Sequence, residues 1–220
     1  RMIMSNSLTE LSRVLNFTFG SKFHSSSWRR QEKGFRLPRA FVMTDEKRLP
    51  DPITILDRLS PDIAIIFRHY NHDHRRILAH KLVDFAHRRG IQVLIAGDFR
   101  LAQIARADGV HIPSYMLGTQ RIQRTIHARP NWLFTAAIHN AKELYYATKL
   151  DIHAAIASPV YKTTTRIQRN SLGPIGLLRL THSTKIPIFA LGGLTRFSIP
   201  TLKNTGVAGF AGIGEFLKFV

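Results

Sequence analysis

The stretch PIFALGGLT, Pro187–Thr195, is a continuous apolar run that ends in two adjacent glycines. Seven other short apolar runs share this character: AFVMT from Ala40, IAIIF from Ile63, VLIAG from Val93, GVHIP from Gly109, LFTAA from Leu133, HAAIASPV from His153 and GFAGIG from Gly209. Strands that are apolar along their whole length are buried on both faces, as parallel strands beneath covering helices are. The sequence therefore predicts a sheet of parallel strands.

The spacing of these runs predicts the architecture. Their centres lie 17 to 33 residues apart, which leaves room for a crossover helix between successive strands. Asn140 is expected to begin one such helix, with Glu143 three residues later as in a capping box. His74–Gly90 is a second, and its expected apolar face is formed by Ile77, Leu78, Leu82, Phe85 and Ala86. We expect a single (β/α)8 barrel over residues 37–220, with a doubly wound open sheet as the alternative.

Composition narrows the class of protein. The 220 residues contain no apolar run of membrane-spanning length and no cysteine, which argues against a membrane span and disulfides and favours a cytoplasmic protein. Residues 1–36 are Ser-rich and basic, and we expect them to form an arm rather than a domain. The formal net charge of +18 attracts polyanions. Because no nucleic-acid motif accompanies the scattered basic residues, a site for phosphorylated small molecules is favoured over nucleic-acid binding.

The two glycines at the end of the Pro187 run fall where a barrel of this kind commonly binds phosphate, at the loops after its last two strands. Gly192 and Gly193 would let backbone N–H groups approach phosphate oxygens, and a short helix beginning near Gly214 would add its positive end. After the sixth run, Thr163, Thr164 and Thr165 offer hydroxyls between the cations Lys162 and Arg166. Tight turns and a polar surface loop are the alternatives for these segments.

Five stretches, in this order, resemble the thiamine phosphate synthase and thiazole tautomerase (TenI) family: FVMTD, GDFRLAQIARADGVHIP, SPVYKTTT, IPIFALGGLT and GVAGFAGIGEF. The resemblance covers about residues 38–218 and implies a (β/α)8 barrel. The synthase of this family joins a pyrimidine methyl diphosphate to a thiazole phosphate and releases pyrophosphate with magnesium. The tautomerase isomerises a thiazole carboxylate phosphate. The resemblance assigns the thiazole phosphate to Thr163, Thr165, Gly192, Gly193, Ile213 and Gly214.

The diphosphate half of the family's pattern is incomplete in this chain. The synthase's Gln, Arg and Lys after the second strand correspond to Ile66, Arg68 and Tyr70. The resemblance therefore implies that Arg68 alone contacts diphosphate, with a surface salt bridge as the alternative. The resemblance implies that Asp98 is retained as a magnesium ligand, with a helix cap as the alternative, while the second carboxylate is lost in the Ser114–Met116 stretch. Magnesium prefers several oxygen ligands, so one carboxylate with diphosphate predicts weak binding. Further departures are Ala137 for a serine and Arg166 for a lysine.

Histidines supply the remaining candidates. His139 matches a family histidine after the fifth strand and is a candidate general acid or base, with helix capping as the alternative. His111 on the fourth strand is expected to serve packing and hydrogen bonding inside the barrel first, with ligand contact second. The residues His69, His72, Asp73 and His74 lie close in sequence, yet we favour a basic solvated loop over a metal site there. The tautomerase's histidine before the Thr loop is replaced by Pro159.

These observations lead to one expected function and two alternatives. The expected function is that of a thiamine phosphate synthase-like transferase, with weakly bound magnesium as its expected cofactor. The alternatives are a tautomerase-like isomerase, in which His139 would take over the catalytic role, and a non-catalytic barrel that binds phosphorylated ligands or nucleic acid. The expected partner is a phosphorylated small molecule, and a homodimer is a further expectation.

Overall fold

The computed structural model describes residues 37–163 and 170–213. Within them the strands form a closed barrel in which neighbours in sequence pair in parallel and the last strand pairs with the first. The strands are β1 (Ala40–Met43), β2 (Ile63–Phe67), β3 (Val93–Ala96), β4 (Gly109–Ile112), β5 (Leu133–Ile138), β6 (Ala154–Ala157), β7 (Ile188–Leu191) and β8 (Gly209–Gly212). Each strand lies in one of the apolar runs, so the predicted (β/α)8 barrel is confirmed and the open sheet is wrong.

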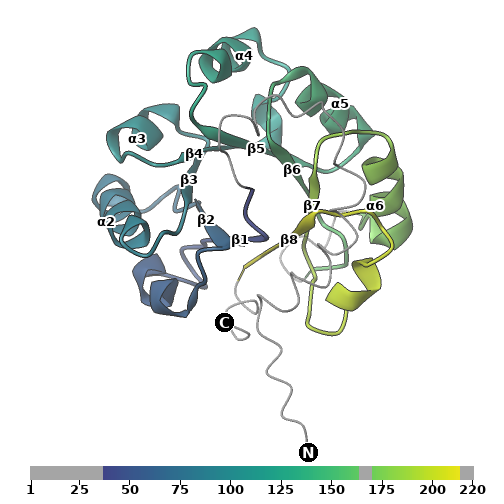
Figure 1. Ribbon diagram of the computed structural model, residues 1–220, viewed down its shortest axis with the longest axis horizontal. Helices are drawn as coiled ribbons and strands as arrows, with labels where there is room; N and C mark the ends of the chain where they lie inside the picture. The colour runs from purple at the N-terminus through teal and green to yellow at the C-terminus, as the bar shows by residue number, and fades with distance from the viewer. Residues whose placement is uncertain (1–36, 164–169, 214–220) are drawn as a thin grey trace, which may run out of the picture.

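Helices connect the strands and lie outside the ring that the strands form in Figure 1. The α-helices are α2 (Arg75–His87), α3 (Phe99–Ile104), α4 (Gln120–His127), α5 (Ala141–Lys149) and α6 (Gly173–His182). The 3-10 helices are η2 (Pro52–Arg58), η3 (Ser114–Met116) and η4 (Ile199–Leu202). Among the described residues no helix is both long enough and apolar enough to cross a membrane. The arm expected at residues 1–36 and the helix expected near Gly214 lie outside the described residues.

Helix α2 forms where the sequence predicts it, and the predicted buried face is right at Leu82 and Ala86 but wrong at Ile77 and Phe85. Ile77 is 56% exposed and Phe85 is 37% exposed. The residues that are buried on this helix are Ala79, Leu82, Val83 and Ala86. These positions follow the i, i+3, i+4, i+7 spacing of one helical stripe, and its two alanines let the helix lie close to the barrel. The apolar ring of Phe85 is partly covered from solvent by Arg88, whose guanidinium lies 5.2 Å from the ring centroid.

The core consists of an inner and an outer layer. The inner layer fills the barrel and contains Phe41, Met43, Ala64, Ile66, Leu94, Ala96, Leu133, Ala154, Ile156, Phe189, Ala208 and Ala211. Large and small side chains alternate around it, so that Phe41 pairs in register with Ala64 on one side and with Ala211 on the other. The rings of Phe41 and Phe189 meet edge to face with centroids 4.8 Å apart. The barrel is therefore a packed core, and ligands have access only at its ends.

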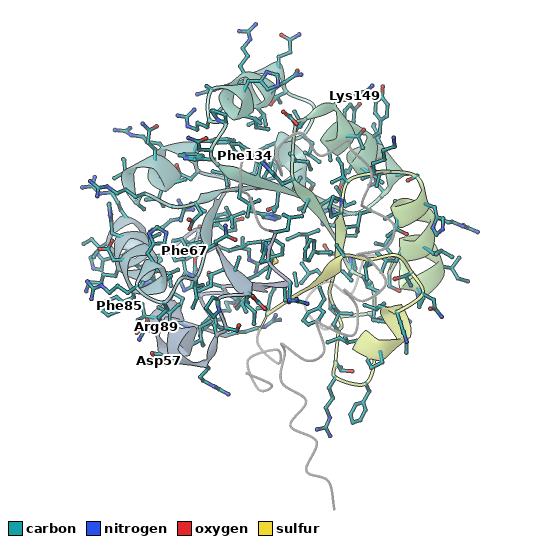
Figure 2. All side chains as sticks on the ribbon, in the orientation of Figure 1. Asp57, Phe67, Phe85, Arg89, Phe134 and Lys149 are labelled. Carbon is teal, nitrogen blue, oxygen red and sulfur yellow. The ribbon has the colours of Figure 1, made fainter. Side chains whose placement is uncertain are left out.

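The outer layer lies between the strands and the helices. Phe67 on β2 and Phe134 on β5 are fully buried there, and Figure 2 shows them inside the molecule. Phe85, Arg89, Asp57 and Lys149 lie at the periphery of the same view. Burial on both sides of each strand explains why the strands contain almost no polar residues.

Candidate functional site

The parallel strands place the residues that follow them at one mouth of the barrel. Arg68 directly follows β2, Asp98 comes two residues after β3, and His139 directly follows β5. The loop after β6 contains Lys162 and Thr163, Gly192 and Gly193 follow β7, and Ile213 follows β8. Thr165, Arg166 and Gly214 lie outside the described residues. The closed sheet thus brings together every predicted site residue that the structure describes.

Gly192 and Gly193 both adopt conformations that favour glycine, with φ values of +98° and +66°. A Cβ on Gly193 would lie 2.7 Å from Cβ of Tyr161 and 2.8 Å from the carbonyl oxygen of Lys162. A Cβ on Gly192 would lie 3.0 Å from Cα of Pro159. The glycine pair is therefore required for the loop after β7 to pack against the loop after β6. Their predicted contact with phosphate remains a prediction.

The loop after β6 is attached on both of its flanks. The N–H of Tyr161 donates to the carbonyl of Gly192 (3.0 Å), and the N–H of Leu172 donates to the carbonyl of Pro159 (2.9 Å). The hydroxyl groups of Tyr161 and Thr201 lie 2.7 Å apart, which links the loop to η4. Lys162 is exposed and Thr163 is half-buried. A cation and a hydroxyl are thus carried by a loop whose position is set by its own internal hydrogen bond, by the loop after β7 and by η4.

Arg68 is held at the mouth by the loop after β1. Its peptide N–H donates to Oγ1 of Thr44 (2.9 Å), and its Nε donates to the carbonyl oxygen of Thr44 (3.1 Å). Its Nη2 lies 3.4 Å from a carboxylate oxygen of Asp45, and the Arg68 side chain is 22% exposed. The guanidinium is therefore preorganised. Thr44 and Asp45 belong to the FVMTD stretch, but their contacts with Arg68 depend on the pairing of β1 with β2.

His111 lies beneath this mouth, inside the barrel. It is 3% exposed, and its Nδ1 lies 2.9 Å from Oγ1 of Thr135, its partner in the β4–β5 register. Burial, and to a smaller extent the positive charge of Arg68, lower the pKa of His111 to about 3. The imidazole is therefore neutral. The structure confirms that this histidine serves packing and hydrogen bonding.

His69 is the buried member of the histidine-rich stretch after β2. Its Nδ1 lies 2.9 Å from Oγ1 of Thr44, and its Nε2 lies 3.1 Å from the carbonyl oxygen of Leu49 and 3.2 Å from that of Pro50. Burial lowers its pKa more than these hydrogen bonds raise it. Both ring nitrogens of His69 thus form hydrogen bonds that hold the loop after β1 against the residues that follow β2. In the described part of the chain, no three His, Cys, Asp or Glu side chains form a group that could hold a metal ion.

Asp98 is the residue expected to bind magnesium, and both of its oxygens have other partners. Oδ1 accepts a hydrogen bond from the N–H of Leu101 (2.8 Å) and so caps α3. Oδ2 accepts from Nη1 of Arg75 at 2.8 Å. The described residues therefore do not fit a magnesium ion, because their one carboxylate at this place already binds a guanidinium. Sequence reasoning missed Arg75, which is one of several basic residues in the stretch after β2.

His139 is oriented by an acidic residue one turn further along the chain. Its N–H and its Nδ1 both lie 2.8 Å from Oε2 of Glu143. Asn140 caps α5, the helix that contains Glu143, because its Oδ1 accepts a hydrogen bond from the N–H of Glu143 (2.9 Å), as the sequence predicts. When Nδ1 donates to the carboxylate, Nε2 of the imidazole is left as an acceptor. The arrangement suits both helix capping and proton transfer.

Comparisons with known proteins show which family this chain resembles in sequence. A family model described as thiamine monophosphate synthase matches residues 53–216. The putative thiamine-phosphate synthase 2 of Aquifex aeolicus is 27% identical over 187 residues, which is 83% of this chain and 99% of that protein. The thiamine-phosphate synthase of a Hydrogenobaculum species is 24% identical over 199 residues, which is 90% of this chain and 88% of the relative.

A solved structure is similar in fold. The thiamine phosphate pyrophosphorylase from Pyrococcus furiosus superimposes with a TM-score of 0.66 at 24% sequence identity, and the alignment covers 80% of this chain and 85% of that one. At this level of identity the likeness supports the barrel alone.

Proposed function

Because the chain belongs to the thiamine monophosphate synthase family, we propose that it is a synthase-type transferase of thiamine biosynthesis that binds thiazole phosphate at the loops after β6, β7 and β8. Pyrimidine methyl diphosphate would occupy the opposite side of the same mouth, beside Arg68. The enzyme would join the two substrates and release pyrophosphate.

The observation that carries this proposal is the close packing of the glycine pair against the loop after β6. Gly193 lies too near Tyr161 and Lys162 for any side chain, so glycine is required to place the loop after β7 here, where its backbone amides would be the groups that meet a ligand. Such amides, together with the Thr163 hydroxyl and the Lys162 ammonium, are suitable donors for a phosphate monoester dianion. The phosphate would hold the thiazole in place for attack on the diphosphate substrate.

The binding half of the proposal is tested by thermal unfolding with and without thiazole phosphate. We expect the ligand to raise the melting temperature of the wild type, because it binds only the folded state. Gly193→Ala should abolish the shift, since its Cβ would displace the loop after β6. Gly90→Ala is the matched control, because Gly90 has φ +67° but no atom nearer than 3.8 Å to its Cβ position, far from the mouth.

The outcome that would contradict the binding proposal is an equal ligand shift in Gly193→Ala and Gly90→Ala, or no shift in the wild type. The transferase half is tested by pyrophosphate release from the two substrates. Arg68→Met should reduce this release while leaving the thiazole phosphate shift intact, because the guanidinium lies on the other side of the mouth. Loss of both readouts in Arg68→Met would argue against separate subsites.

The contact between His139 and Glu143 favours a second candidate function, a thiazole tautomerase. An imidazole that is oriented through Nδ1 by a carboxylate has its Nε2 available to move a proton, as an isomerase requires. Isomerisation of the thiazole carboxylate phosphate by the wild type, lost in His139→Gln but not in Arg68→Met, would support this function over the transferase. Pyrophosphate release that survives His139→Gln would favour the transferase.

A further inference from the structure

Arg75 is bound to the carboxylate on which the family resemblance places magnesium. Its Nη1 donates to Oδ2 of Asp98 at 2.8 Å, and its Nη2 donates to the carbonyl oxygen of Ala96 at 3.1 Å. Both acceptors belong to the carboxyl end of β3, so a single guanidinium spans them. The two oxygens that a metal ion would find at this edge of the barrel are therefore already occupied by a cation.

The Arg75 side chain is held firmly in this position. It is 18% exposed, and its guanidinium lies 5.9 Å from the ring centroid of Phe67 and 5.8 Å from that of Tyr70. Its Nε is buried and has no hydrogen-bond partner among the described residues. A guanidinium displaced from Asp98 would lose its counter-charge while still largely buried, which is strongly unfavourable. A metal ion would therefore have to compete with an intramolecular partner that is always present.

The remaining surroundings provide few ligands for magnesium, which requires near-octahedral coordination by oxygen. The second oxygen of Asp98 caps α3, as described above. The stretch that corresponds to the family's second carboxylate forms η3, and it contains Ser114, Tyr115 and Met116. The residue before Asp98 is Gly97, which has no side chain to contribute.

We propose that the guanidinium of Arg75 takes the place of a divalent cation on Asp98, so that this side of the mouth binds its anionic ligand with side-chain cations alone. Arg75 neutralises the carboxylate that would otherwise repel a diphosphate. Arg68, which is fixed by Thr44 and Asp45, is the second arginine on this side. Guanidinium groups that are already fixed in position bind phosphate oxygens through charge-assisted hydrogen bonds. This inference rests on the proposed function in one respect, because the proposed function identifies the anion as a diphosphate.

The test measures metal binding directly, with Mn²⁺ as the probe and electron paramagnetic resonance as the readout, because Mn²⁺ accepts the same oxygen ligands as magnesium. The wild type and Asp98→Asn should bind Mn²⁺ equally weakly. Arg75→Met should bind it roughly tenfold more tightly or better, because the substitution frees the Asp98 carboxylate and the Ala96 carbonyl. Adding Asp98→Asn to Arg75→Met should remove the gain.

Arg76→Met is the matched control, because Arg76 is the exposed neighbour on the same helix and its removal changes the net charge equally. Two outcomes would overturn the proposal: Mn²⁺ binding by the wild type that Asp98→Asn abolishes, or a gain in Arg75→Met no larger than in Arg76→Met. If Arg75→Met fails to fold by circular dichroism, Arg75→Gln replaces it, and the comparison of the wild type with Asp98→Asn remains decisive. No substrate is present, so failure here is distinct from failure of the thiazole phosphate shift.

Discussion

His111 is expected to make the barrel sensitive to acid. This histidine is 3% exposed inside the barrel, and burial, with the charge of Arg68, lowers its pKa to about 3. An unfolded chain accepts a proton on histidine at about pH 6.5, whereas the folded protein does not accept one until the pH is far lower. The neutral imidazole therefore contributes its full stabilising effect above about pH 6.5, the pKa of histidine in the unfolded chain. This effect is lost progressively as the pH falls from there toward the folded pKa.

The size of the effect follows from the number of protons that the two states bind. One proton taken up only by the unfolded state lowers the free energy of unfolding by about 1.4 kcal/mol per pH unit. Between about pH 7 and about pH 5, His111 alone should remove about 2 kcal/mol, since histidine in the unfolded chain changes over this range from mostly neutral to protonated. A loss of this size is a substantial part of the ~5–15 kcal/mol typical of a folded domain.

The assay is urea unfolding of the wild type and His111→Asn at both pH values. Asparagine places a polar atom near the position of Nδ1, toward Thr135, but it does not titrate. We expect the variant to be the less stable protein at about pH 7 and to lose about 2 kcal/mol less than the wild type on acidification. His69 also has a pKa lowered by burial, but it is present in both proteins and its effect cancels. Loss of stability that is parallel in the two proteins to within ~0.5 kcal/mol would refute the reasoning.

Three further substitutions test the packing, the capping and the surface of the barrel. Phe41→Ala leaves a cavity beside Phe189, so it should lower the free energy of unfolding, measured in urea, by about 3–5 kcal/mol. A loss below ~1 kcal/mol would contradict a packed barrel interior. Asn140→Ala should cost about 1 kcal/mol through the loss of the α5 cap, and Asn140→Asp should restore most of it; equal melting temperatures for the two variants would argue against capping. Arg89→Met breaks an ion pair with Asp57, but it should change the free energy of unfolding by less than ~1 kcal/mol, because that pair is solvent-exposed. A larger loss in the same assay would show that the ion pair stabilises the protein more than its exposure indicates.

The features that could be predicted from the sequence depend on residues close together in the chain. The strands are apolar at nearly every position because both of their faces are buried, so all of the strands could be located from short runs alone. The cap of α5 likewise involves only Asn140 and Glu143, which lie three residues apart. The order of strands and helices then favours a parallel barrel over a doubly wound open sheet, and the pairing of β8 with β1 closes it.

Features that depend on contacts between distant segments were decided by the tertiary structure. The buried stripe of α2 follows from which face can approach the barrel closely, and periodicity alone favoured Ile77 and Phe85 wrongly. The ion pair of Arg75 with Asp98 joins residues that are 23 positions apart, and it forms because adjacent parallel strands end at the same edge. The sequence predicts that Gly192 and Gly193 form a turn or bind phosphate, but only the tertiary structure shows that the loop after β6 packs against them. A local pattern specifies burial and turns, whereas closure of the barrel decides which side chains meet.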